Sequence, residues 1–154
     1  MPSSGPAGLS HMTFVVADLD AMEEILVSVL GAKKVYDSGS DTFSLSEERF
    51  FELGDARLWV AIMKGEALPA RTYNHIAFAV DEAELDDYRA RILALGLELR
   101  EGRSRVEGEG RSLYFYDRDN HLFELHTGTL EQRLTRYARG RQPQSMSQET
   151  GREP

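Results

Sequence analysis

The stretch His11-Met-Thr-Phe-Val-Val returns further along the chain as His75-Ile-Ala-Phe-Ala-Val, and this repetition decides the fold. Both copies follow the pattern His-x-x-Phe-x-Val, which is typical of a half-buried β-strand. A strand that begins each half predicts two similar units. Each unit is too small to bury both faces of its sheet alone, so the two must pack together.

A helix is expected after each copy of the repeat. The first is capped by Asp20, with Glu23 completing a capping box, and ends at Gly31. The second is capped by Asp81 and ends at Gly96. The apolar stripes are Met22, Ile25, Leu26, Val29 and Leu30 in the first helix and Leu85, Tyr88, Ile92 and Leu95 in the second.

Strand-like segments follow each helix, at residues 34–36, 43–45, 50–53 and 58–63 in the first half and 98–100, 113–116 and 122–126 in the second. We interpret each half as βαβββ, although the first half has one strand-like segment more than the second. Paired βαβββ modules form a cup-shaped mixed sheet with helices outside, which is an α+β fold. We expect one domain over residues 9–139, with repeats at about 9–64 and 72–127 and a last helix at about 129–139. Residues 1–8 are expected to be flexible and residues 140–154 to form a disordered tail.

Composition excludes several classes of function. The 154 residues carry a net charge of −8, so a nucleic-acid surface is not expected. The absence of cysteine excludes disulfides, thiolate metal ligands and a cysteine nucleophile. No apolar run is long enough to span a membrane, and the start lacks the features of a signal peptide, so we expect a cytoplasmic protein.

The repeat also predicts a metal site. His11 and His75 occupy equivalent positions, so both can point into the cup near the axis that relates the halves. Glu124 lies in an apolar strand, where a carboxylate is costly unless it is paired or bound to a metal. Two imidazoles and one carboxylate leave coordination positions open, which is typical of catalytic sites for Mn(II), Fe(II), Zn(II) or Ni(II). His121 and His126 lack the support of the repeat, and we expect them to be structural.

Three stretches together resemble the fosfomycin-resistance proteins of the vicinal-oxygen-chelate, or glyoxalase-like, superfamily. They are GLSHMTFVV at 8–16, RTYNHIAF at 71–78 and GEGRSLYFYDRDNHLFELHTGTLEQRL at 108–134. Asn120 stands where many members have glycine. The resemblance implies a domain-swapped homodimer in which halves of two chains complete each cup. It also implies Mn(II), with other divalent metals possible, and fosfomycin as the small-molecule substrate.

The resemblance also assigns residues. His11, His75 and Glu124 match the metal ligands. The substrate-binding positions are matched by Thr13, Trp59, Ser112, Tyr114 and Arg133. A loop lysine that thiol-transferring members use is absent, because Ser104 falls at about that position. Arg103, Arg105 or Arg111 is left to contact the phosphonate, and the sequence does not choose among them.

The nucleophile depends on FSLSEERFFELG at 43–54. Water needs a general base to open an epoxide at neutral pH, whereas a thiol can attack as thiolate. Alternation leaves Glu47 or Glu48 as that base, and the resemblance to the epoxide-hydrolase subgroup selects Glu48 as catalytic, with Glu47 facing solvent. The expected reaction is hydrolysis of fosfomycin to a vicinal diol, which confers resistance.

Three alternatives remain. The first is thiol transfer from glutathione or bacillithiol to the same drug, and the second is an Fe(II) dioxygenase or related hydrolase with another substrate. The third is a non-catalytic drug-binding protein, which the three metal ligands disfavour.

Overall fold

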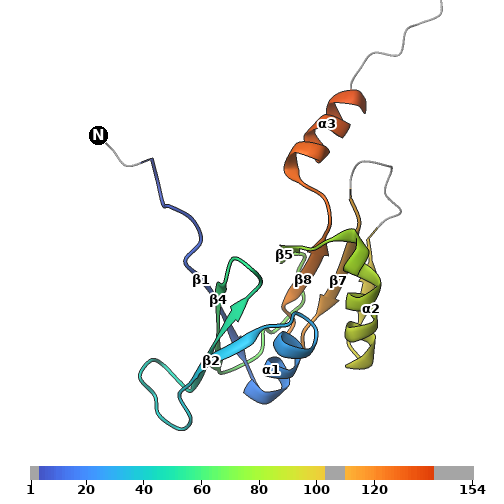
Figure 1. Cartoon of the computed structure of the whole chain (residues 1–154). Helices are drawn as coiled ribbons and strands as arrows, with labels where there is room; N and C mark the ends of the chain where they lie inside the picture. Colours follow the sequence, from blue (N-terminus) through green and yellow to red (C-terminus); the bar gives the residue numbers. More distant parts are fainter. Residues whose placement is uncertain (1–3, 103–109, 141–154) are drawn as a thin grey trace, which may run out of the picture.

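The computed structural model describes residues 4–102 and 110–140 (Figure 1). The first half contains β1 (His11–Val16), α1 (Leu19–Ser28), β2 (Lys33–Asp37), β3 (Glu48–Leu53) and β4 (Leu58–Lys64). The second half contains β5 (His75–Ala79), the 3-10 turn η1 (Glu82–Glu84), α2 (Leu85–Ala94), β6 (Leu99–Glu101), β7 (Ser112–Tyr116) and β8 (Leu122–His126). Helix α3 (Leu130–Gly140) follows. The predicted βαβββ order of both halves is confirmed.

Each half forms its own four-stranded mixed sheet. The strand orders are β1-β4-β3-β2 and β5-β8-β7-β6. In each sheet the first strand pairs in parallel with the fourth strand of its half, and the other pairs are antiparallel. The two sheets therefore repeat one topology. The eight-stranded cup does not close within one chain, because β1 and β5 are both sheet edges among the described strands.

One face of each sheet contributes to a core shared by the two halves. Phe51, Phe115 and Phe123 are almost fully buried there. Phe14 of β1 meets Phe123 of β8 edge-to-face, with ring centroids 5.3 Å apart, so the first half packs directly on the second. Burial of these aromatic side chains supplies much of the apolar driving force. The faces that could form a cup consequently point away from this core.

The first helix begins at a different cap from the one predicted. Asp18, not Asp20, is the N-cap, and its Oδ1 accepts hydrogen bonds from the backbone NH groups of Asp20 (2.9 Å) and Ala21 (3.1 Å). Glu23 completes no capping box, because its carboxylate pairs with Lys34 and Arg49. A carboxylate that can reach two cations on the neighbouring sheet gains more there than at the helix terminus.

The start of the second helix also differs from expectation. Asp81 precedes the 3-10 turn η1 and makes no side-chain cap bond, and α2 begins only at Leu85. Helices α1 and α2 end at Ser28 and Ala94, three and two residues before the glycines at which the sequence predicted their ends. Gly31 and Gly96 have φ angles of 68° and 67°, a region that other residues enter only with strain.

The strand predicted at 43–45 is wrong. This segment lies in the loop between β2 and β3, where Phe43 and Leu45 are 80% and 94% exposed. In this loop, hydrogen bonds typical of turns take the place of pairing between strands. The Asp37 carboxylate accepts from the Gly39 backbone NH, and the Ser38 hydroxyl accepts from the Glu48 backbone NH.

The turn between β7 and β8 ties the two halves together. Asp119 is buried and its Oδ1 accepts a hydrogen bond from the backbone NH of Ala17, at 2.8 Å. Asp117 holds His121, with Oδ2 2.6 Å from Nδ1, and the His121 ring packs against Phe14. His121 is thus structural, as predicted.

Helix α3 extends away from both sheets (Figure 1), and none of its residues is buried within the chain. Within residues 4–102 and 110–140, no helix is long and apolar enough to cross a membrane. The division into one domain over 9–139 and two tails stays a prediction, and residues 141–154 lie outside the described part.

Candidate metal centre and catalytic cup

Two of the three predicted metal ligands meet on the second sheet. His75 begins β5, and Glu124 lies at the centre of the neighbouring β8. The register pairs His75 with Leu122 and Ala77 with Glu124, so both side chains project from the face opposite the core. His75 Nε2 lies 3.0 Å from Glu124 Oε2. We call this face the second half-cup; it carries His75, Ser112, Tyr114, Glu124 and His126.

Glu124 is buried yet remains ionised. Only 5% of the residue is exposed. Burial alone would raise the pKa of its carboxyl, but the hydroxyls of Ser112 and Tyr114 and the neighbouring imidazoles outweigh burial and lower that pKa. Ser112 Oγ donates to Glu124 Oε1 at 2.6 Å. A charged carboxylate is therefore held in place, as a metal ligand must be.

The orientation of His75 leaves one ring nitrogen for a ligand. Nδ1 lies 2.7 Å from the carbonyl oxygen of Tyr73, which can only accept, so Nδ1 carries the proton. In neutral His75 the lone pair of Nε2 then faces the Oε2 of Glu124. Two acceptors 3.0 Å apart repel each other unless a cation or a proton lies between them.

A metal ion fits this pair. Two ligand atoms bound at about 2.1 Å and at right angles to each other are about 3.0 Å apart. That value matches the observed Nε2–Oε2 separation. The backbone carbonyl on Nδ1 and the hydroxyl on Oε1 are the outer-shell partners that metal ligands usually have.

The third predicted ligand, His11, does not join them within one chain. Its ring lies against that of Trp59 at a tilt of 31°, with centroids 4.2 Å apart, and its Nδ1 lies 3.0 Å from the Ser10 hydroxyl. Among the described residues, no group of three histidine or acidic side chains could hold a metal. His11 lies instead on the corresponding free face of the first sheet. The expectation that all three ligands meet is therefore unmet in the single chain.

The free face of the first sheet also carries Glu48. Cross-strand neighbours share a face, and the registers align His11 with Trp59, Thr13 with Ala61 and Phe50, and Glu48 with Met63. We call this face the first half-cup. Its members named by the sequence prediction are His11, Thr13, Trp59 and Glu48, and Trp59 is 39% exposed. The substrate positions Thr13 and Trp59 thus share a surface with the predicted base.

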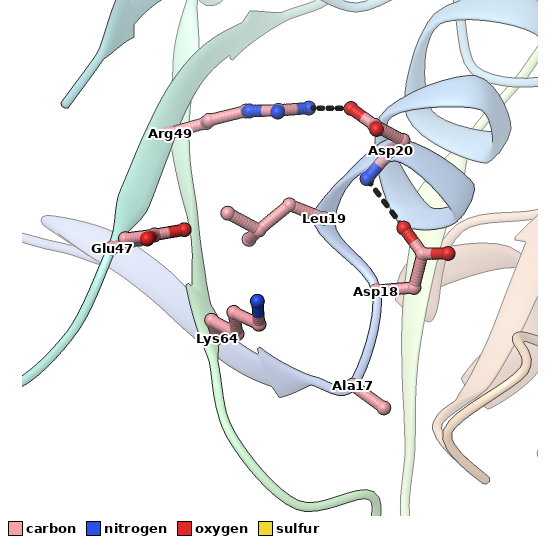
Figure 2. Close-up of a pocket in the computed structure, with 7 residues that line it drawn as sticks. All are labelled: Ala17, Asp18, Leu19, Asp20, Glu47, Arg49 and Lys64. Carbon is pink, nitrogen blue, oxygen red and sulfur yellow. Dashed lines mark hydrogen bonds and ion pairs between the residues drawn. The ribbon is translucent and has the colours of Figure 1, made fainter. Parts of the chain in front are cut away.

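Glu47 points the other way. Figure 2 shows its side chain in an open hollow of about 350 Å³ at the start of α1, together with Arg49 and Lys64. Arg49 projects to the helix side and donates to Asp20 at 2.8 Å. Glu47 is partly exposed in this hollow, away from the first half-cup. Alternation along β3 consequently leaves Glu48 as the acid of this pair on the first half-cup.

The predicted anion-binding residues divide between two places. Tyr114 lies beside Glu124 on the second half-cup, and burial, together with hydrogen bonds to Tyr73 and Glu124, raises the pKa of its hydroxyl, so it remains a donor. Ser112 is buried against Glu124. Arg133 is half-buried on α3.

Of the three arginines predicted as phosphonate contacts, the structure describes only Arg111. Arg111 lies 3.9 Å from Glu82 through Nη1 and is about half exposed. Arg103 and Arg105 lie outside the described residues. Gly110 is described, and it has φ +76° with a Cβ position only 2.5 Å from the Gly128 backbone nitrogen. Glycine is therefore required where this loop meets the end of β8.

Sequence reasoning missed two contacts in the second half-cup. The Tyr73 carbonyl that orients His75 is a backbone group, so this contact cannot be predicted from the identity of the residue. His126, kept as structural, lies 2.7 Å from Ser112 Oγ through Nδ1. His126 comes two residues after Glu124 in β8, so strand alternation could have predicted that both side chains lie on the same face.

Fold and site together define a class. A sequence profile of the Glyoxalase/Bleomycin resistance protein/Dioxygenase superfamily matches residues 8–125, and the chain belongs to this family. Within it, the chain is 60% identical over 133 residues to the fosfomycin resistance protein FosX of Mesorhizobium japonicum, covering 86% of this chain and 94% of the relative. It is 37% identical over 144 residues to the metallothiol transferase FosB of Shouchella clausii, covering 84% and 86%.

Solved structures agree with this grouping. A crystal structure of a variant of FosX from Listeria monocytogenes contains Mn(II) and 1S,2S-dihydroxypropylphosphonic acid. It superimposes with a TM-score of 0.76 at 53% identity, covering 86% of this chain and 99% of that one. FosX from Mesorhizobium loti also gives 0.76, at 55% identity.

Proposed function

We propose that this protein hydrolyses the epoxide ring of fosfomycin to a vicinal diol in a Mn(II)-dependent reaction and thereby confers resistance to the drug. The observation that carries the proposal is the convergence of His75 Nε2 and the buried carboxylate of Glu124 on the second half-cup. The similarity to a FosX structure that holds Mn(II) and a dihydroxypropylphosphonate supports the same metal and reaction.

The metal site is completed by a second copy of the chain. His11 and His75 are the first residues of β1 and β5, which are edge strands of the two sheets among the described residues. When the first half-cup of one chain faces the second half-cup of its partner, His11 joins the partner's His75 and Glu124. A homodimer built this way has two cups, each with residues from both chains.

Each side chain then has a role. Bound Mn(II) supplies Lewis-acid polarisation of the epoxide oxygen and stabilises the negative charge that develops on it. Glu48 accepts a proton from water, and the oxygen of that water attacks a ring carbon. The C–O bond of the epoxide breaks, its electron pair stays on the former ring oxygen, and that oxygen takes up one proton from solvent while Glu48 releases one to solvent.

The other predicted side chains can bind the phosphonate of fosfomycin or line the cup around the drug. The hydroxyl of Tyr114 stays protonated and can donate to a phosphonate oxygen. Arg133 supplies a bidentate cation when α3 lies over the cup, and Ser112 lies at the metal ligand. Thr13 and Trp59 line the wall contributed by the first half-cup.

Glutamate-to-glutamine substitutions at two adjacent positions test this assignment. Glu48→Gln should lower the rate of diol formation roughly 10²–10⁴-fold and leave Mn(II) affinity unchanged, because it removes only the base. Glu47→Gln is the matched control, since Glu47 directly precedes β3 and its side chain points away from the first half-cup, and it should retain most of the activity. Phosphorus NMR of fosfomycin follows the reaction, with Mn(II) affinity measured in parallel. Equal rates for the two variants would exclude Glu48 as the base.

Thiol transfer is the second candidate, because the metallothiol transferase relative shares the fold. A glutathione or bacillithiol adduct formed faster than the diol would support it. Glu48 lies on the cup face. Hydrolysis needs a general base there and thiol transfer does not, so the position of Glu48 favours water as the nucleophile.

A further inference from the structure

Ser112 stands between two side chains of the second half-cup. It begins β7, and the register places it opposite His126, while Tyr114 lies opposite Glu124. Its Oγ lies 2.6 Å from Glu124 Oε1 and 2.7 Å from His126 Nδ1. Ser112 and Glu124 are only 6% and 5% exposed, so water does not compete freely for these bonds.

Counting protons fixes the direction of both hydrogen bonds. A hydroxyl has one proton and two lone pairs, and an ionised carboxylate can only accept. The Ser112 proton therefore goes to Glu124 Oε1. Oγ must then accept from His126, so His126 carries a proton on Nδ1. The result is a directed chain from imidazole to hydroxyl to carboxylate.

These hydrogen bonds give the two carboxylate oxygens of Glu124 different partners. Oε1 is occupied by Ser112, whereas Oε2 lies 3.0 Å from His75 Nε2. His126 Nδ1 is 3.5 Å from Oε1, so its effect on the carboxylate runs mainly through Ser112. A carboxylate without this restraint could rotate and bind a metal through both oxygens or pair with another cation.

We propose that His126 and Ser112 form a positioning relay that holds Glu124 Oε1 and presents Oε2 alone to the metal. His126 is thus a positioning residue rather than a ligand or a catalytic residue. The inference rests on the proposed metal function of His75 and Glu124. Outer-shell partners of this kind typically change metal affinity 10- to 100-fold when removed.

The test is a Mn(II) titration of the full-length protein, with free Mn(II) measured by its EPR signal and no substrate present. His126→Leu and Ser112→Ala should each weaken Mn(II) binding roughly 10- to 100-fold. His126→Asn should stay within about threefold of wild type, because its amide nitrogen occupies the position of Nδ1 and can donate to Oγ. Circular dichroism and urea midpoints check that each variant folds, and Ser112→Ala probes the relay even if His126→Leu does not fold.

The double variant separates a relay from direct ligation. If His126 acts through Ser112, adding His126→Leu to Ser112→Ala should weaken Mn(II) binding little further. Independent losses that add up would overturn the relay and indicate that His126 acts on Glu124 or on the metal without Ser112. His126→Asn as weak as His126→Leu, or folded single variants with wild-type affinity, would also overturn it. Wild-type protein that does not bind Mn(II) would overturn the proposed function, and the relay with it.

Discussion

The shared cup makes a quantitative prediction about mixtures of inactive variants. His11→Ala and Glu124→Gln each remove one metal ligand from every site, so each variant alone should lose activity. Because His11 lies in the first half-cup and Glu124 in the second, a mixed dimer has one doubly damaged cup and one intact cup.

The magnitude follows from random assembly. Equal amounts of two chains give mixed dimers as about half of all dimers, and each has one intact site of two. Co-refolded His11→Ala and Glu124→Gln should therefore regain roughly a quarter of wild-type activity. Turnover of fosfomycin by phosphorus NMR at fixed total protein and saturating Mn(II) measures it.

A second pair of variants provides the control. His11→Ala and Glu48→Gln both damage the first half-cup, so no mixed dimer contains an intact site, and this mixture should stay inactive. No recovery in the first mixture, with mixed dimers shown to form, would refute sharing of the cup between chains. Recovery in the control mixture would place His11 and Glu48 in different cups.

The remaining predictions concern stability, measured by urea unfolding. Phe123→Ala should lower the free energy of unfolding by about 3–5 kcal/mol, because its ring is 1% exposed at the junction of the two halves; a loss below about 1 kcal/mol would contradict this packing. Asp119→Ala should cost about 1–3 kcal/mol by leaving the Ala17 backbone NH without its acceptor, and Asp119→Asn, which keeps an acceptor oxygen, should cost less. The Gly39 backbone NH, aided by nearby cations, lowers the pKa of Asp37, so its contribution is present above its ordinary value of 3.8 and is lost as the pH falls through the lower folded-state pKa. Asp37→Asn should thus lower the urea midpoint at pH 7, and this deficit should shrink as the pH falls below 3.8; a deficit that does not shrink would contradict this cause.

The repeat predicted the topology well because it records a duplicated local structure. Matching strands, helices and terminal glycines occur at matching places in both halves, and each is specified by nearby residues. The repeat could not show which halves face each other. His11 and His75 are equivalent whether a cup is built within one chain or between two, and the choice depends on the packing of Phe14 against Phe123.

Competition between partners explains the errors in local structure. Asp20 and Glu23 have the sequence of a capping box, but Arg49 on β3 binds both carboxylates, and Asp18 takes the cap. Such long-range ion pairs have no signature in a local pattern.

The errors at the catalytic strand have a related origin. Phe43 and Leu45 alternate with serines as in a strand, yet no neighbouring strand pairs with them in the described residues. Alternation did predict that Glu47 and Glu48 face opposite ways. Alternation alone could not tell which of them faces the cup; the family resemblance selected Glu48, and the ladder that β3 forms with β4 puts Glu48 on the face that carries His11 and Trp59.

The most direct test of the central claim is to incubate fosfomycin with the wild-type protein in ¹⁸O-enriched water, without thiol, and to follow the product by phosphorus NMR and its mass by mass spectrometry. We predict that the drug is converted to a single dihydroxypropylphosphonate that carries one ¹⁸O from solvent, and that conversion stops when Mn(II) is removed. Fosfomycin that stays intact, or that reacts only after glutathione or bacillithiol is added, would contradict the account.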